Sequence, residues 1–175
     1  MGFERIGGET IWEGKIATVR VDRFRYDDGE EAEREIVAHP GAVAVVAHDG
    51  QRLYMVRQPR EPVNEQSLLE LPAGKLDEQG EDVLTTARRE LAEEIGKAAD
   101  RWEHLTTFYT SPGFAAEEVH LYLATELRDE KAESGEEERI EIVEIPLEKL
   151  DEAIADCHDS KSLVGLLWFR AYCSH

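Results

Sequence analysis

Residues 74–96, GKLDEQGEDVLTTARRELAEEIG, carry the pattern from which the fold is inferred. Within this stretch the apolar residues recur four apart and draw one stripe along a helix, at Val83, Ala87, Leu91 and Ile95. Gly96 follows the stripe, and glycine suits a helix end because it adopts the left-handed conformation without strain. The stretch therefore predicts a helix over about residues 82–95 that packs its apolar stripe on a core.

Three carboxylates share another face of this helix. Glu90, Glu93 and Glu94 stand at i, i+3 and i+4, so their side chains project together. Like charges spaced in this way destabilise a bare helix, which invites a cation as the missing partner. Carboxylate oxygens suit Mg²⁺ or Mn²⁺ better than zinc. We therefore expect the three carboxylates to face away from the core and to hold a divalent metal; a solvated acidic face is the alternative.

Mostly β structure surrounds the helix in the sequence. Residues 10–38 alternate apolar and polar side chains on either side of an Asp-Gly pair, which predicts a hairpin. The continuous apolar run at 42–47 indicates a strand covered on both faces. Strands are expected at 42–48, 53–58, 104–110, 119–125 and 140–145, a loop at 59–80, and one or two helices after residue 146. This order predicts a layered α/β or α+β fold.

Composition restricts the class of partner. The chain has 175 residues with 20 Lys and Arg against 39 Asp and Glu, a net charge of −19, so one domain of ordinary size is expected. This charge argues against nucleic acid and against an anionic membrane surface as partners. No apolar run approaches the roughly 20 residues that span a bilayer, and residues 1–5 lack the basic-then-apolar order from which a signal peptide would be expected. Two cysteines imply no disulfide framework, which fits the cytoplasm.

The longer pattern around the helix resembles the Nudix box. In that motif a glycine and a glutamate with five residues between them precede seven spacer residues and then Arg-Glu-aliphatic-x-Glu-Glu-x-Gly. Glu81, seven spacers and residues 89–96 match it position by position. Two positions depart from it: six residues separate Gly74 from Glu81, which affects the orientation of Glu81, and Lys97 replaces a usual aliphatic residue.

Segments outside the box are similar to the ADP-ribose pyrophosphatase branch of Nudix hydrolases. They are VRQPR at 56–60, LELPAG at 69–74 and SPGF at 111–114. The resemblance implies a Nudix α/β/α sandwich with a mixed sheet over residues 39–175. It also implies an N-terminal antiparallel β extension, residues 1–38, that helps to form a homodimer and exchanges between subunits in such relatives.

The resemblance further implies Mg²⁺-dependent hydrolysis of the diphosphate of ADP-ribose to AMP and ribose 5-phosphate. Two or three Mg²⁺ ions, or Mn²⁺, are expected on Glu90, Glu93, Glu94, Glu138 and the carbonyl of Ala73. Glu136 is the expected general base, with Glu138, Glu93 and Arg89 as the other catalytic residues. The expected substrate contacts are Arg57, Glu70, Gly113, Phe114 and Glu117, and the expected supports of the box are Gly74, Glu81 and Gly96.

Some of these assignments have alternatives in the sequence. Glu70 could equally pair with Arg57 or Arg60, and the aromatic residues Trp12, Phe24 and Tyr26 are candidates for stacking on a base or for ordinary packing. The substrate could instead be another nucleotide sugar or a dinucleotide. A binding sensor without turnover ranks lower, because all three helix carboxylates are present.

Overall fold

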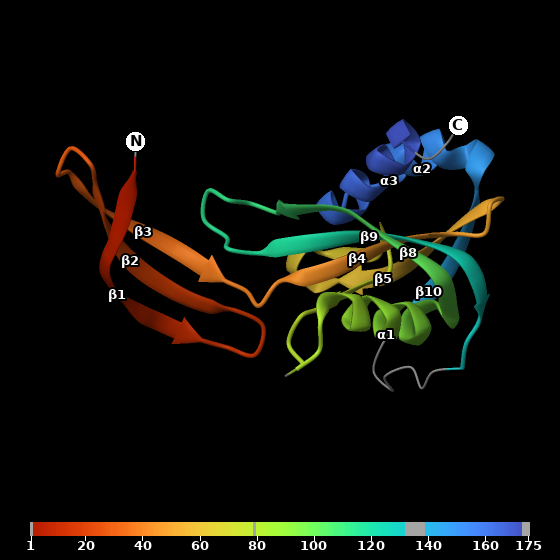
Figure 1. The fold of residues 1–175 in the computed structure, drawn as a ribbon, viewed down its shortest axis with the longest axis horizontal. Coiled ribbons are helices and arrows are strands. Elements are labelled where there is room, and N and C mark those ends of the chain that lie inside the picture. Colours follow the sequence, from red (N-terminus) through yellow and green to blue (C-terminus); the bar gives the residue numbers. More distant parts are fainter. Residues whose placement is uncertain (1, 79, 132–138, 173–175) are drawn as a thin grey trace. The chain divides into compact units, whose positions relative to one another are not determined.

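The computed structural model describes residues 2–78, 80–131 and 139–172, and the chain divides into two compact units (Figure 1). The N-terminal unit comprises the residues up to Gly41 together with Phe108–Glu118, and the second unit comprises Ala42–Thr107 and the chain from Val119 onward. Sequence patterning grouped only residues 1–38 into the first region. It gave no sign that residues 108–118 would pack with them.

The N-terminal unit contains a three-stranded antiparallel sheet in the order β1-β2-β3. Its strands are β1 (Phe3–Glu13), β2 (Thr18–Tyr26) and β3 (Glu31–Ala38). The predicted hairpin joins β2 to β3, and Gly29 in its turn has a φ of 88°, a conformation that glycine adopts without steric cost. The segment after Tyr109 joins this sheet through the backbone of Val37, whose N–H donates to Phe114 O and whose carbonyl accepts from Ala116 N, both at 2.9 Å.

The second unit is built on a mixed sheet, as expected. Its strand order is β10-β5-β4-β9-β8, with β6 beside β5 and β7 beside β4. The strands are β4 (Ala42–His48), β5 (Arg52–Arg60), β6 (Glu65–Glu70), β7 (Ala73–Lys75), β8 (Lys97–Tyr109), β9 (Glu118–Asp129) and β10 (Glu141–Pro146). β4 pairs parallel with β9 and antiparallel with β5 and β7.

The expectation of a loop over residues 59–80 is wrong for residues 59–75. A 3₁₀ turn (Glu61–Val63) leads into β6, which pairs with β5, and β7 pairs with β4. Of the residues that suggested a loop, Pro59 lies near the end of β5, Pro62 lies in the 3₁₀ turn, and Pro72 lies between β6 and β7, which has only three residues. These strands exist because distant strands offer them hydrogen bonds, and a local pattern does not contain that information.

Helices cover both faces of the sheet, with α1 (Val83–Ile95) on one side and α2 (Leu150–Asp156) and α3 (Ser160–Tyr172) on the other (Figure 1). The side chain of Asp82 caps α1 by accepting a hydrogen bond from Thr85 N at 3.0 Å. Gly96 ends α1 with a φ of 65°, as the sequence predicted. No helix in the described ranges is long and apolar enough to cross a membrane.

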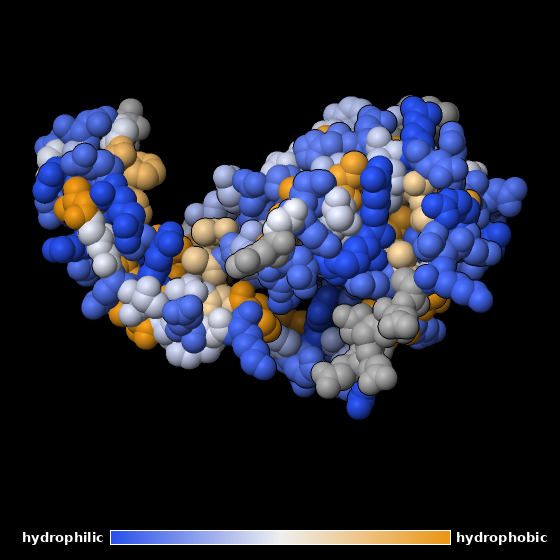
Figure 2. Space-filling view, turned by 60° about the horizontal axis from the view of Figure 1, so that its bottom comes forward, coloured by the Kyte–Doolittle hydropathy of each residue, from blue (hydrophilic) through white to orange (hydrophobic). Residues whose placement is uncertain are grey.

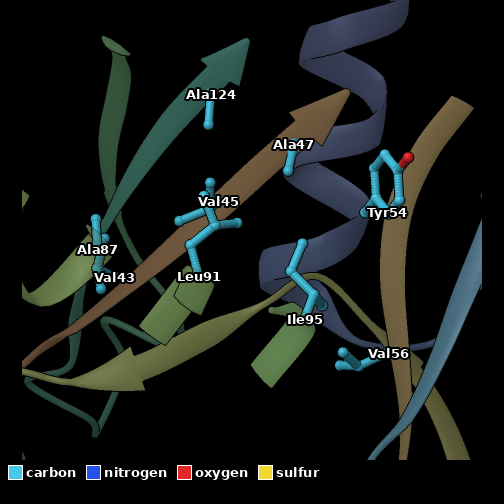
Figure 3. Close-up of a cluster of buried hydrophobic side chains, with 9 residues drawn as sticks. All are labelled: Val43, Val45, Ala47, Tyr54, Val56, Ala87, Leu91, Ile95 and Ala124. Atoms are coloured by element: carbon cyan, nitrogen blue, oxygen red, sulfur yellow. The ribbon is translucent and has the colours of Figure 1, made fainter. Parts of the chain in front are cut away.

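The core lies on both faces of β4, whose residues 42–47 are all buried. Val43, Val45 and Ala47 pack with the apolar stripe of α1 (Figure 3). On the opposite face α3 comes close to the sheet: a Cβ added at Gly165 would lie 3.1 Å from Val46 Cγ2. The prediction of a strand covered on both faces is confirmed, and the sheet holds α1 in a defined position.

Truncation of the α1 stripe should be costly. Leu91 is fully buried, so Leu91→Ala should lower the free energy of unfolding by about 2–5 kcal/mol, measured by urea denaturation. Leu167→Ala on α3 is the matched control, since Leu167 is 45% exposed, and it should cost about 0.5 kcal/mol or less. Equal losses in the two variants would contradict the packing described here.

Candidate active site

Arg89 lies at the centre of the acidic cluster on α1. Its Nη1 donates to Glu90 Oε1 at 2.8 Å and to Glu93 Oε2 at 3.0 Å, and its Nε lies 3.3 Å from Glu81 Oε1. Burial lowers the pKa of the guanidinium, but the hydrogen bond to Glu81 and the charge of Glu90 outweigh burial and raise it. Arg89 therefore stays charged and offsets the repulsion between the carboxylates of Glu81, Glu90 and Glu93.

Glu94 is buried, which corrects the expectation that all three helix carboxylates face away from the core. It is 7% exposed, and its Oε2 accepts a hydrogen bond of 2.9 Å from the backbone N–H of Ala73. Glu94 follows Leu91 by three positions, so it lies at the edge of the apolar stripe. Its carboxylate thus connects α1 to β7 instead of standing in solvent.

Gly74 makes room for the carboxylate of Glu90. A Cβ added at Gly74 would lie 2.0 Å from both Cδ and Oε1 of Glu90, far inside any tolerated contact. The β7 backbone therefore lies directly against the acidic face of α1. The extra residue between Gly74 and Glu81 does not remove Glu81 from the cluster, because Glu81 Oε1 lies 3.3 Å from Arg89 Nε; its Oε2 also accepts a hydrogen bond from Thr86 Oγ1 at 3.0 Å.

The oxygens gathered here suit a hard divalent cation. Glu94 and Glu90 lie against the backbone of Ala73 and Gly74, Glu93 follows Glu90 by three positions on α1, and carboxylate oxygens are the ligands of a Mg²⁺ or Mn²⁺ site. Within residues 2–78, 80–131 and 139–172, no three His, Cys, Asp or Glu side chains are grouped as a metal would require. Arg89 holds two of the carboxylates in this structure, and the metal site stays a prediction.

Glu70 is a fully buried carboxylate at the end of β6, and it pairs with Arg60. Arg60 Nε donates to Oε1 at 2.6 Å and Nη2 donates to Oε2 at 2.9 Å, a two-point contact. Lys161 Nζ reaches the same Oε2 at 2.5 Å. Of the two partners left open for Glu70 by the sequence, the structure therefore selects Arg60.

Arg57 has other partners. Its Nη2 donates to Asp156 Oδ2 at 2.7 Å and its Nη1 donates to the Ser67 carbonyl at 3.1 Å. The sequence offered Arg60 only as a partner of Glu70 and not as a substrate contact. The hydrogen bond to Glu70 raises the pKa of the Arg60 guanidinium, and the charge of Glu94 acts in the same direction. Arg60 ends β5, and the β5–β6 hairpin that brings it to Glu70 covers residues for which the sequence predicts a loop.

The other expected substrate contacts belong to the N-terminal unit. Glu117 Oε2 accepts a hydrogen bond of 2.8 Å from Thr110 Oγ1, and its Oε1 lies 3.5 Å from His39 Nδ1. Gly113 and Phe114 lie in the turn that follows Ser111, and both line a pocket of about 410 Å³ within this unit. Aromatic faces of the pocket come from Phe3, Phe24, Tyr26, Tyr109 and Phe114. Trp12 is not among the lining residues.

Two expected residues lie outside the described ranges. They are Glu136 and Glu138, the expected general base and the expected metal-reaching glutamate. Among the residues that the structure describes, the expected site residues that lie together at the β7 backbone are Arg89, Glu81, Glu90, Glu93 and Glu94.

Comparisons with known proteins show what the chain is similar to. The family model described as NUDIX domain matches residues 38–164. The chain is 43% identical to an ADP-ribose pyrophosphatase of Bacillus subtilis over 94% of this chain and 91% of that protein. It is 40% identical to a methanol dehydrogenase activator of Bacillus methanolicus over 93% and 89% of the two chains. A solved structure described as an ADP compounds hydrolase has the same fold, with a TM-score of 0.85 at 22% identity, covering 98% of this chain and 94% of that one.

The contact between Gly74 and Glu90 predicts a specific defect. Gly74→Ala should displace the Glu90 carboxylate and weaken Mg²⁺ binding, measured by calorimetry, by about tenfold or more. Gly7→Ala is the control, because a Cβ there would meet nothing closer than 3.4 Å, and it should leave Mg²⁺ binding unchanged. Wild-type affinity in Gly74→Ala would show that the position of Glu90 does not matter for the metal.

Proposed function

This chain belongs to the NUDIX domain family, and from that premise we propose that it hydrolyses the diphosphate of ADP-ribose to AMP and ribose 5-phosphate in the presence of Mg²⁺. The observation that carries the proposal is the placement of Glu90 and Glu94 directly against the β7 backbone at Ala73 and Gly74. The carboxylates of Glu90 and Glu94 offer the oxygen ligands that Mg²⁺ prefers, and an acidic protein needs such a cation to bind a diphosphate. The named function of the Bacillus subtilis relative supports ADP-ribose as the substrate.

The acidic residues have distinct proposed roles. Two or three Mg²⁺ ions would be held by the proposed ligands Ala73 (through its carbonyl), Glu90, Glu93, Glu94 and Glu138. Bound there, the metal would neutralise the diphosphate and lower the pKa of a water molecule. Glu136 would accept a proton from the attacking water as general base. Arg89 would keep Glu90 and Glu93 oriented, since it donates to both.

Arg60 is the proposed protein contact to the diphosphate in the second unit. Its side chain is 40% exposed, and its Nε and Nη2 are held by Glu70. Its Nη1 has no hydrogen-bond acceptor among the described residues, so this edge of the guanidinium is available for a phosphate oxygen. Arg57 and Glu70, the other expected substrate contacts of this unit, stay proposed contacts; in this structure Arg57 donates to Asp156 and to the Ser67 carbonyl.

Gly113, Phe114 and Glu117 remain proposed substrate contacts. The pocket of the N-terminal unit offers aromatic faces from Phe24 and Tyr26, which suit stacking on a nucleobase. Glu35 also lines the pocket, and its carboxylate suits the polar edge of such a base. The low cysteine count of the chain supports the further proposal that it works in the cytoplasm.

A substrate panel tests this function. With Mg²⁺ and chromatographic detection of AMP, ADP-ribose should be among the best substrates when compared with other nucleotide sugars and dinucleotides. Glu94→Gln should lower kcat by about 100-fold or more, because several kcal/mol of metal stabilisation are lost. Glu103→Gln on β8, an exposed position, is the control and should match the wild type. Turnover of Glu94→Gln within tenfold of the wild type would refute the metal assignment.

The N-terminal unit is also the proposed site of homodimer formation. Hydrophobic residues interrupt its hydrophilic surface at the left of Figure 2. Large apolar side chains exposed on β1 are Phe3, Ile11 and Trp12. Exposed apolar area of this kind on one sheet is typical of an interaction surface.

The dimer proposal predicts a particular mass in solution. Light scattering after size exclusion should give twice the mass of one chain, and Ile11→Asp, at a side chain that is 57% exposed, should shift the protein toward a single chain. Leu167→Asp on α3 carries the same change of charge and should leave the mass unchanged. A wild-type protein with the mass of one chain would refute the proposal.

A further inference from the structure

The first turn of α3 is bonded to the end of β6. The backbone N–H of Leu71 donates to Ser162 Oγ at 2.7 Å, and Ser162 Oγ donates in turn to Asp159 Oδ2 at 2.5 Å. Asp159 Oδ2 also accepts from Ser162 N at 3.0 Å, as a helix cap does. Leu71 is two residues before Ala73, whose N–H binds Glu94. The start of α3 thus supports the strand end that leads into the carboxylate cluster.

Lys161 brings a cation into this connection. Its Nζ lies 2.5 Å from Glu70 Oε2 and 2.9 Å from Asp159 Oδ2, and its side chain is only 17% exposed. The side chain of Glu70 is 1% exposed. A carboxylate so deeply buried is costly unless cations and hydrogen bonds compensate it, and removal of one partner leaves a charge that is not fully compensated.

Arg60 and Lys161 share the charge of Glu70. Both donate to Oε2, and Arg60 alone reaches Oε1. Arg60 and Lys161 face Glu70 and Asp159, so two positive charges balance two negative charges within the cluster. Lys161 neutralises part of the negative charge of Glu70. Less of the positive charge of Arg60 is therefore neutralised within the cluster, and more remains to attract an anionic group outside it.

We propose that Lys161 is a positioning residue for the diphosphate: it fixes the Glu70 carboxylate, and Glu70 in turn orients Arg60 with its Nη1 edge toward the substrate. The inference rests on the proposed function, since it deepens the role of Arg60 there. Lys161 itself touches no substrate in this scheme. Its effect passes through Glu70 to Arg60.

Loss of the Lys161 charge should affect substrate binding more than chemistry. In Lys161→Met, the Glu70 carboxylate loses the contact that fixes its Oε2, so the orientation of the Arg60 guanidinium bound to it is less well defined. The KM for ADP-ribose should rise by about tenfold, the size expected for one weakened charged hydrogen bond, while kcat changes by less than about threefold. Lys161→Arg keeps the charge and should hold KM within about threefold of the wild type.

A double-mutant cycle with Arg60→Gln separates positioning from general destabilisation. If Lys161 acts through Arg60, Lys161→Met should change KM by less than about twofold once Arg60→Gln is present. Lys149→Met, at an exposed lysine before α2, is the control and should match the wild type. The unfolding midpoint of every variant is recorded as a measure of stability. If Lys161→Met acted only by lowering stability, its effect on KM would be independent of Arg60→Gln, and the two effects would multiply in the double mutant.

The outcomes separate the two proposals. An active wild type whose KM is unchanged in Lys161→Met, or multiplicative effects in the cycle, would overturn the role of Lys161 and leave the proposed function intact. A wild type that neither hydrolyses ADP-ribose nor binds it in calorimetry would overturn the proposed function and this inference with it.

Discussion

The contact between the β7 backbone and the acidic face of α1 is the constraint on which the rest of the site depends. The Ala73 N–H binds Glu94, and the absence of a side chain at Gly74 admits the carboxylate of Glu90. Both contacts require α1 to lie at one distance from the sheet, which the buried stripe around Leu91 provides. The hydrophobic core therefore determines the spacing of polar atoms, because close-packed interiors do not deform continuously.

Local cations, and not the net charge, organise the acidic residues. The chain carries 19 more acidic than basic side chains, yet Glu90 and Glu93 share Arg89, and Glu70 shares Arg60 with Lys161. Such contacts have most effect where water is scarce, since buried pairs are screened far less than exposed ones. Most of the remaining acidic residues are exposed and contribute to solubility. An anionic substrate therefore finds a few positively charged side chains on a surface that is otherwise negative and repels it.

The helix and the main strands were predictable because their signals are local. The four-residue period from Val83 to Ile95 and the glycine at 96 define α1, and the Asp-Gly turn defines the β2–β3 hairpin. β6 and β7 were not predictable from the same signals. β7 has three residues and pairs with β4, about thirty positions earlier in the chain, so its hydrogen bonds depend on the folded sheet.

The sequence by itself determined the helix, its three carboxylates and the family to which the chain belongs, because each follows from spacing along one segment. Only the tertiary structure decided that Glu94 is buried, that Arg60 and not Arg57 holds Glu70, and that Lys161 reaches Glu70 across 91 positions. The physical reason is that helix periodicity acts over a few residues, whereas ion pairs between strands and helices depend on register and packing over the whole chain.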